Sequence, residues 1–191
     1  MWGLGDYAEL SEALRPAAEA LADACAVSAG QEVLDVAAGD GNFAVACARE
    51  GARVVASDLS PGMVERGRAR SEREGYDIEW VEADVEDLPF EDGEFDLVQS
   101  FAGLHCFPNP RKAVLEIARV VKPGGRFTGS VFLTGTGLRY LPGIIGGRLA
   151  GVMGPSGSRS DLDSWLHEAG FQNVRIDMSG AIGYFAATKP G

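Results

Sequence analysis

The chain has 191 residues, of which 46% are hydrophobic and 24% charged, and its formal net charge is −11. This length suits one domain with a substantial core, so we expect residues 1–191 to form a single domain. Because nucleic acids and anionic lipids attract proteins largely through Lys and Arg, the negative charge disfavours both as partners.

The first predicted element is a helical segment over residues 7–27, and residues 1–30 are expected to form a helical cap. Pro16 lies within it and should split or kink the helix, because proline lacks the N–H that a helix interior requires. No basic stretch precedes an apolar core at the start of the chain, and no apolar run approaches about eighteen residues. Neither a signal peptide nor a membrane-spanning helix is therefore predicted.

Beyond residue 30, apolar runs of strand length alternate with segments of helical period. This alternation is typical of an α/β protein whose parallel sheet is covered by helices on both faces. The last two runs are separated only by Ser179-Gly180, which permits a hairpin but no crossover helix. We therefore expect a doubly wound, mostly parallel seven-stranded sheet with an antiparallel C-terminal hairpin, in three layers. The predicted strands are 32–36, 53–58, 78–82, 95–100, 125–134, 174–178 and 181–189.

Polar residues followed by proline mark two predicted helix starts. Ser60-Pro61 and Asn109-Pro110 each place a side chain that can accept from free amides before a proline at the first helical position. Ser160 with Asp163 resembles a capping box that opens a later helix. Residues 122–125, Lys-Pro-Gly-Gly, are expected to end the helix that begins after Asn109.

A glycine-rich insertion is predicted over residues 135–158, with eight glycines between positions 135 and 157. Apolar residues at helical spacing favour a short amphipathic helix inside it. These residues are Leu138, Leu141, Ile145, Leu149 and Val152.

The stretch from Val33 to Val45, VLDVAAGDGNFAV, is the first candidate ligand site. In an open parallel sheet, ligands bind beyond the carboxyl ends of the strands, and a glycine turn that enters a helix offers free N–H groups there. Taken alone, the turn is equally a tight connection with no ligand, and it also fits the dinucleotide fingerprint G-x-G-x-x-G/A. Asp58, at the end of the second strand, suits a ribose diol but does not distinguish one nucleoside from another.

The rest of the pattern resembles the class I S-adenosylmethionine-dependent methyltransferases, with the ubiquinone and menaquinone C-methyltransferases as the most similar group. The resemblance runs over about residues 2–190, and its motifs occur in the family's order. They are VLDVAAGDG, VVASDLSPGMVE, ADVEDLPF, FDLV, LHCFPNP, KPGG and LHEAGF. The resemblance implies a Rossmann-like methyltransferase fold, S-adenosylmethionine as cofactor and S-adenosylhomocysteine as product.

The resemblance assigns the glycine turn to the methionine and ribose portions of the cofactor. Ala37, Gly39 and Gly41 would line these portions, and Asp35 would organise the turn. Ala37 stands where many members have Gly, and Asp40 stands where Thr or Ser is frequent. Asp40 is a predicted cofactor-binding residue, because its carboxylate would contact the positively charged ammonium or sulfonium end of the cofactor. The alternative is that it points to solvent.

The remaining cofactor assignments follow the next three strands. Asp58 would hold the ribose hydroxyls, and Leu59 would pack on the adenine. Asp84 would accept from the adenine amino group beside Val85, and Ser100 would lie near the methionine end. Each acid could equally be a solvated residue at a strand end, and Leu59 and Val85 could be ordinary core.

His105 is the candidate catalytic residue, because it follows the fourth strand near the expected methyl position. It would serve as general base for an oxygen or carbon acceptor, and the competing interpretation is that it packs beneath the cofactor or caps the next helix. His167 is expected to be structural. Trp2, Tyr7, Arg139 and Tyr140 are candidates to line the acceptor pocket or to pack.

The sequence favours methyl transfer to a small-molecule acceptor by in-line displacement, with no metal. The turn Gln99-Ser100-Phe101-Ala102 lacks the Asn/Asp-Pro-Pro-aromatic motif of methyltransferases that act on nucleic-acid bases. The alternatives are an NAD-dependent oxidoreductase, for which no Tyr-x-x-x-Lys pair is present, and a cofactor-binding protein without catalysis. The cysteines Cys25, Cys47 and Cys106 have neither CxxC nor Cys/His spacing, which predicts reduced thiols in a cytoplasmic protein.

Overall fold

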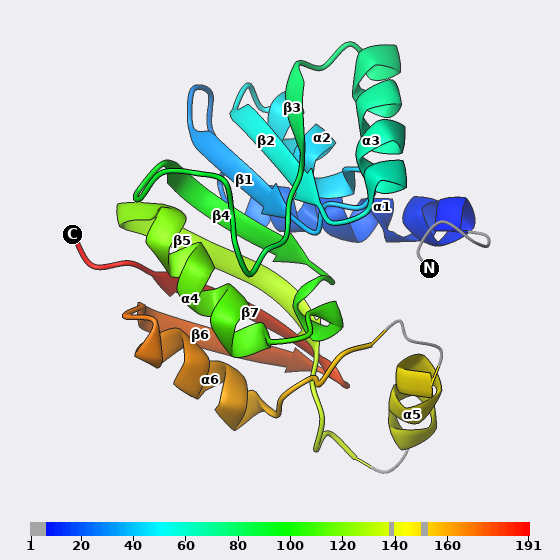
Figure 1. The fold of residues 1–191 in the computed structure, drawn as a ribbon, viewed down its shortest axis with the longest axis vertical. Coiled ribbons are helices and arrows are strands. Elements are labelled where there is room, and N and C mark those ends of the chain that lie inside the picture. The colour runs from blue at the N-terminus through cyan, green and yellow to red at the C-terminus, as the bar shows by residue number, and fades with distance from the viewer. Residues whose placement is uncertain (1–6, 138–139, 150–152) are drawn as a thin grey trace.

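The computed structural model describes residues 7–137, 140–149 and 153–191 (Figure 1). Strands and helices alternate through most of the chain. In chain order they are α1 Tyr7–Ala24, β1 Glu32–Val36, α2 Asn42–Arg49, β2 Arg53–Asp58, α3 Pro61–Glu74, β3 Ile78–Glu82, β4 Phe95–Phe101, the 3-10 helix η1 Leu104–Cys106, α4 Pro110–Val120, β5 Val121–Phe132, α5 Leu141–Leu149, α6 Arg159–Glu168, β6 Gln172–Ser179 and β7 Ile182–Thr188.

The strands form one seven-stranded sheet in the order β3-β2-β1-β4-β5-β7-β6. β1 pairs in parallel with β2 and β4, so Leu34 lies opposite both Val55 and Val98. β7 is antiparallel to β5 and to β6, which makes the C-terminal hairpin the only reversal in the described sheet. The predicted α/β fold class is confirmed.

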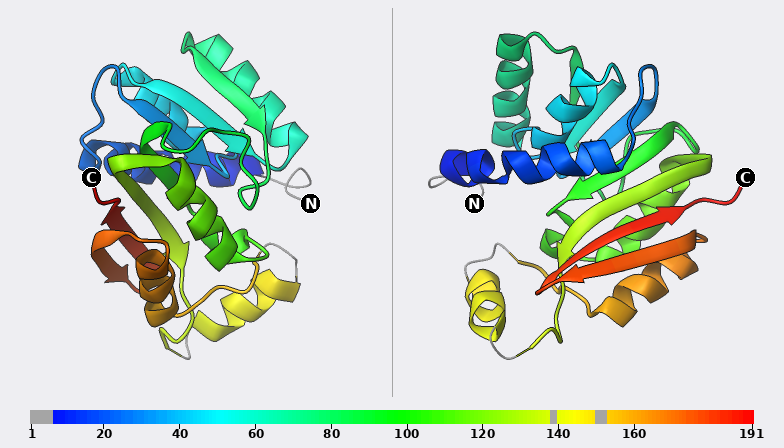
Figure 2. Two further views of the ribbon diagram at one scale, coloured as in Figure 1. Left: turned by 60° about the vertical axis from the view of Figure 1, so that its left-hand side comes forward. Right: turned by 180° about the vertical axis from the view of Figure 1, so that it is seen from behind.

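Helices cover both faces of the sheet and give three layers (Figures 1 and 2). Successive strand residues point to opposite faces, so Val33 packs with α1 and α2, whereas Leu34 packs with α4 and α6. The first core contains Ala18, Phe43 and Val64, and the second contains Ile117, Leu162 and Phe127 among its buried residues. No helix in the described ranges is long and apolar enough to cross a membrane.

Pro16 does not divide the first helix. α1 runs from Tyr7 to Ala24 with Pro16 inside it, so a split of the helix is wrong, whereas the alternative, a kink, stays a prediction. Tertiary contacts hold the helix on both sides of the proline, because Ser11 bonds to Asp40 and Ala18 is fully buried. These contacts outweigh the backbone hydrogen bond that proline cannot make.

Helix capping follows the sequence at one site and departs from it at two. Asn109 accepts from Lys112 N at 3.1 Å, as predicted. Ser60 precedes α3 but makes no side-chain cap bond. The capping box is formed by Ser158 and Asp161 rather than by Ser160 and Asp163. Its position shifts because residue 158 still pairs with Thr134 as extended chain, so the helix begins directly after it.

The helix that begins after Asn109 ends directly before Lys-Pro-Gly-Gly, as predicted, but the strand that follows begins earlier than the predicted Gly125. α4 ends at Val120, and β5 begins at Val121, so Lys-Pro-Gly-Gly lies within β5 at a register shift against β4. The short helix predicted in the insertion is present as α5. Leu138 and Val152, which the prediction placed on this helix, lie outside the described residues.

Candidate functional site

The carboxyl ends of β1, β2 and β4 define the candidate site. The chain proceeds from β1 to β2 and β3 on one side and then returns to place β4 on the other side of β1. A reversal of strand order of this kind is where α/β sheets bind ligands. The glycine turn follows β1, Asp58 ends β2 and Ser100 lies near the end of β4, so these residues share one edge of the sheet.

The glycine turn requires left-handed backbone at three alternate positions. Ala37, Gly39 and Gly41 have φ values of 53°, 60° and 84°. Two features of Gly41 exclude a side chain. Its φ is positive, and a Cβ at this position would lie 2.7 Å from the Trp80 ring. Ala37 adopts the same region at a cost of about 1–2 kcal/mol relative to right-handed backbone. The departure from Gly at this position therefore leaves the turn intact and slightly strained.

Asp58 ties the second strand to this turn. Its Oδ2 accepts from Gly39 N at 2.9 Å, and its Oδ1 accepts from Ser60 N at 2.9 Å. Burial raises the pKa of Asp58, and these two backbone hydrogen bonds oppose the shift. A carboxylate oxygen has two lone pairs, so each oxygen can accept one more hydrogen bond. Asp58 can therefore bind a vicinal diol without releasing the turn.

Three buried polar atoms near the ends of β1 and β4 have no hydrogen-bond partner among the described residues. They are Asp35 Oδ1, Gln99 Nε2 and Ser100 Oγ, on residues that are 1%, 0% and 0% exposed. A Cβ at Gly103 would lie 2.8 Å from Ser100 Oγ and 2.9 Å from Ala37 Cβ. Buried polar atoms are rarely left unpaired in proteins, so this close-packed edge fits a polar ligand.

Asp35 is the most perturbed acid of the site. Burial raises its pKa to about 8, and the hydrogen bond that its Oδ2 accepts from Ala44 N at 3.2 Å opposes the shift. The folded protein therefore binds one more proton than the unfolded chain between about pH 4 and pH 8. Stability from this group is complete below pH 4 and is lost as the pH rises towards 8.

Asp35→Asn is expected to remove this pH dependence. The amide is neutral at every pH and can still accept from Ala44 N, so the variant should exceed the native protein in stability at pH 8 but not at pH 4. The gain at pH 8 should be on the order of several kcal/mol. Denaturant unfolding of both proteins at a series of pH values measures the difference, and parallel profiles would contradict the assignment.

The residues assigned to the adenine lie at the rim of the site. Leu59 is 64% exposed, whereas Val85 is buried in the core that contains Leu34. Asp84 is exposed, and its Oδ1 accepts from Glu86 N at 2.9 Å, which fixes the direction of the carboxylate. The adenine contacts of all three residues stay predictions.

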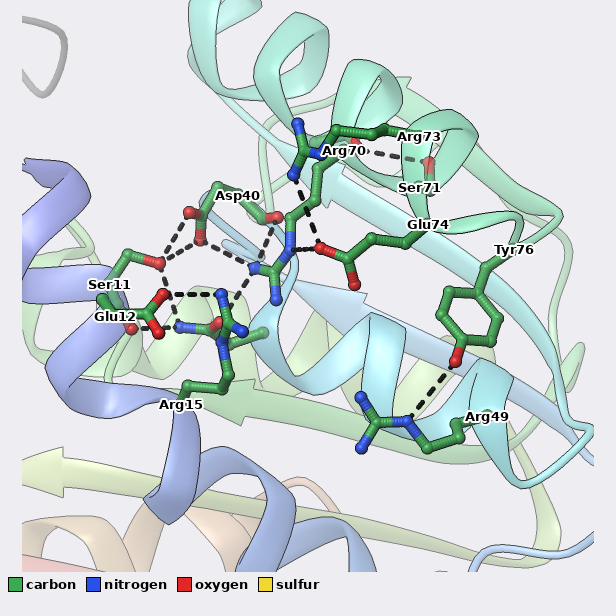
Figure 3. Close-up of polar contacts among 12 residues, drawn as sticks. Ser11, Glu12, Arg15, Asp40, Arg49, Arg70, Ser71, Arg73, Glu74 and Tyr76 are labelled. Atoms are coloured by element: carbon green, nitrogen blue, oxygen red, sulfur yellow. Dashed lines mark hydrogen bonds and ion pairs between the residues drawn. The ribbon is translucent and has the colours of Figure 1, made fainter.

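The Asp40 carboxylate faces the first helix. Ser11 Oγ, on α1, lies 2.7 and 2.6 Å from the two carboxylate oxygens, and Arg70 Nη1, on α3, lies 3.7 Å from Oδ1 (Figure 3). Asn42 Oδ1 accepts from the same Arg70 nitrogen at 2.8 Å. Sequence reasoning missed Ser11, Asn42 and Arg70, although Arg70 has the helical spacing of buried Met63 and Gly67 and so falls on the inward face of α3.

His105 is buried after β4, against the end of β5. Its Nδ1 accepts from Phe132 N at 3.4 Å, and its ring packs edge-on against the Phe132 ring at 5.0 Å. Burial lowers the pKa of His105 to about 4, so the imidazole is neutral at pH 7 and a weak base. These contacts agree with the packing interpretation of His105, and its role as general base stays a prediction.

The other candidates for the acceptor pocket are only partly described. The Tyr140 hydroxyl lies against Gly180, where a Cβ would be 2.5 Å from it. Trp2 and Arg139 lie outside the described residues, as does the side chain of Tyr7. His167 lies on α6, where its Nδ1 contacts the Asp163 carbonyl at 2.8 Å. In the described part of the chain, no three His, Cys, Asp or Glu side chains form a group that could hold a metal ion.

Comparisons with known proteins identify the family of the chain. Residues 34–128 match the Methyltransferase domain family. The demethylmenaquinone methyltransferase of Clavibacter sepedonicus is 36% identical over 189 residues, covering 87% of this chain and 77% of the relative. The YcgJ protein from Bacillus subtilis has the same fold, with a TM-score of 0.78 at 18% identity over 91% of this chain and 98% of that one. The chain belongs to the class I S-adenosylmethionine-dependent methyltransferases.

Other relatives are longer than this chain. The uncharacterized protein Rv1403c of Mycobacterium tuberculosis is 43% identical over 129 residues, which is 67% of this chain and 47% of the relative. The chain thus spans about half the length of that relative. The methyl donor of the family is S-adenosylmethionine. The side-chain oxygens of Asp35, Asp58 and Ser100 fit the polar groups of this cofactor.

Proposed function

We propose that the chain transfers a methyl group from S-adenosylmethionine to a small, rather apolar acceptor by in-line displacement. The observation that carries the proposal is that Asp58 accepts from the Gly39 amide and keeps lone pairs for a ribose diol, at the strand ends where the buried Ser100 Oγ has no partner among the described residues. The family relationship favours methyl transfer over the oxidoreductase alternative, because a dinucleotide turn alone does not distinguish the two. The acceptor class is suggested by the name of the relative from Clavibacter sepedonicus, demethylmenaquinone methyltransferase.

The bound cofactor would supply a methyl group on a positively charged sulfur, which is the electrophile. The residues of the chain bind and orient the cofactor. Asp58 would accept from the ribose hydroxyls, Ser100 would satisfy a polar group at the methionine end, and Asp35 would organise the turn through Ala44 N. Small residues at 37, 39 and 41 allow the close approach of backbone to ligand. Alignment of donor and acceptor atoms in this way is the main source of acceleration that the site can provide.

A neutral acceptor site follows from the groups near the end of β4. His105 is uncharged at pH 7, and Phe107 and Phe132 add aromatic surface beside it. Such a site can bind an uncharged phenol, quinone or amine, because binding would then require no oppositely charged side chain. Proton removal from a hydroxyl or an activated carbon would need a base, and His105 is the candidate for it.

The test is a methyl-acceptor screen with S-adenosylmethionine and small phenols, reduced demethylated quinones and amines. We expect formation of S-adenosylhomocysteine that depends on one acceptor class, and mass spectrometry should find the methylated product. Calorimetric titration with S-adenosylhomocysteine and with NAD accompanies the screen. Tight binding of NAD without binding of the sulfur nucleosides would refute the proposal. Nucleoside binding without turnover on any acceptor would favour a binding protein without catalysis.

A further inference from the structure

A polar cluster joins the first helix to the glycine turn and to α3. Ser11 Oγ donates to the Asp40 carboxylate, and Asn42 Nδ2 donates to Ser11 O at 2.8 Å and to Ser11 Oγ at 3.0 Å. Arg70 Nη1 donates to Asn42 Oδ1 at 2.8 Å and to Asp40 O at 3.3 Å, and Arg70 Nε donates to Glu74 Oε1 at 3.0 Å (Figure 3). Three elements that are separate in sequence thus meet at the centre of the turn.

The cluster is buried enough for its bonds to matter. The Arg70 side chain is 8% exposed, and the side chains of Asp40 and Glu74 are 20% and 26% exposed. A guanidinium held this far from water must be paired, because an unpaired buried charge is costly. Arg70 therefore fixes both the main chain of Asp40 and the first residue of α2.

The cluster is linked to the residue that would hold the ribose. Asp40 lies between Gly39 and Gly41, and Gly39 N donates to Asp58 Oδ2. A shift of the Asp40 backbone therefore moves the donor that orients the Asp58 carboxylate. The route from Ser11 or Arg70 to Asp58 consists of a hydrogen bond to Asp40, the backbone of residues 39–40 and the hydrogen bond from Gly39 N to Asp58.

The third helix supports the turn at a second point. The Trp80 ring lies between Gly41 and Gly67, where an added Cβ would be 2.7 Å and 2.0 Å from it. Trp80 Nε1 donates to Ser71 Oγ at 3.1 Å. α3 therefore supports the turn through its packing and hydrogen bond with Trp80. Ser11, on α1, supports the turn separately through its hydrogen bond to Asp40.

We propose that Ser11, Asp40 and Arg70 are positioning residues that couple the docking of α1 to nucleoside binding at the glycine turn. The inference rests on the proposed function and specifies how its cofactor site is regulated. By linkage, a docked α1 strengthens nucleoside binding, and a bound nucleoside stabilises the docked α1 by the same factor. Asp40 acts through the turn and does not contact the nucleoside.

Calorimetric titration of S-adenosylhomocysteine into the Ser11→Ala and Asp40→Ala variants tests the coupling. Alanine is used at position 40 because an asparagine oxygen could still accept from Ser11. Each variant should bind about five- to tenfold more weakly than the native chain, since coupling factors of this kind start at about fivefold. The double variant should bind about as weakly as Asp40→Ala alone, because both changes break the hydrogen bond between Ser11 and Asp40. Hydrogen exchange of the α1 amides gives a second readout. Saturating S-adenosylhomocysteine should slow this exchange in the native chain and much less in Asp40→Ala.

Glu19→Gln is the matched control. Glu19 also joins α1 to α2, through Arg49 Nη1 at 3.1 Å, but this exposed ion pair makes no contact with the turn. The control should keep native affinity for S-adenosylhomocysteine.

Native affinity in both Ser11→Ala and Asp40→Ala would overturn the coupling and leave the proposed function standing. Weak binding in Asp40→Ala with native binding in Ser11→Ala would also overturn it, because Asp40 would then act on the nucleoside without Ser11. Failure of the native chain to bind S-adenosylhomocysteine would instead remove the proposed function and the coupling with it.

Discussion

Asp58→Ala is expected to weaken binding of S-adenosylhomocysteine at least about a hundredfold. Hydrogen bonds to a charged acceptor contribute about 1.5–3 kcal/mol each, and two ribose hydroxyls would lose theirs. A loss of about 3 kcal/mol is about a hundredfold in the dissociation constant. The alanine also releases Gly39 N and Ser60 N, so the turn loses its attachment to β2. Calorimetric titration measures the change.

Asp96→Ala provides the matched control for this experiment. Asp96 is also an acid on a strand that accepts from the backbone of a neighbouring strand, since its Oδ2 accepts from Glu32 N at 2.9 Å. It lies at the start of β4, at the opposite edge of the sheet from the site. The control should lose stability but keep native affinity. Retention of native affinity in Asp58→Ala would show that the ribose is placed elsewhere.

Gly67→Ala is expected to destabilise the protein by about 3 kcal/mol, the upper part of the range for overpacked cores. Glycine in a helix normally gains stability on replacement by alanine, so the sign here is reversed. The reason is that a Cβ at position 67 would lie 2.0–2.3 Å from three carbons of the Trp80 ring. The ring cannot move away, because Gly41 lies against it and Ser71 Oγ holds its N–H. Denaturant unfolding at constant pH measures the loss.

Gly62→Ala, in the same helix, is the matched control. A Cβ at position 62 would meet only Ser60 Oγ, at 3.9 Å, and the residue is exposed. This variant should be as stable as the native chain or slightly more stable. A double variant, Gly67→Ala with Trp80→Leu, should recover part of the loss because the smaller side chain makes room. Equal stability of Gly67→Ala and Gly62→Ala would contradict the packing described for Trp80.

Local sequence patterns predicted the sheet well. Apolar runs bounded by glycine and proline located all seven strands within a few residues, and the short spacing at Ser179-Gly180 predicted the antiparallel hairpin. These features depend on side-chain period and turn chemistry, which neighbouring residues determine. The predictions failed where a distant contact outweighed local preference. Pro16 lies inside α1 because Ser11 and Ala18 are held by other elements, and α6 begins at Arg159 because residue 158 pairs with Thr134.

The residues of the candidate site also fall into those that could be placed from local sequence patterns and those that depend on distant contacts. Asp35, Gly39, Gly41, Asp58 and Ser100 could be placed from the sequence, because strand ends in a parallel sheet converge at one edge. The orientation of Asp40 could not, since its partners Ser11 and Arg70 lie 29 and 30 residues away in the chain.

The sequence by itself determined the α/β class, the methyltransferase resemblance and the acids at the strand ends, because each follows from periodicity or from an ordered set of short motifs. Only the tertiary structure decided that Asp40 faces α1, that Trp80 fills the space between Gly41 and Gly67, and that His105 is buried and neutral. The physical reason is that hydrogen bonding and desolvation depend on which groups lie within a few ångströms of one another. For these residues, those groups come from other elements of the fold.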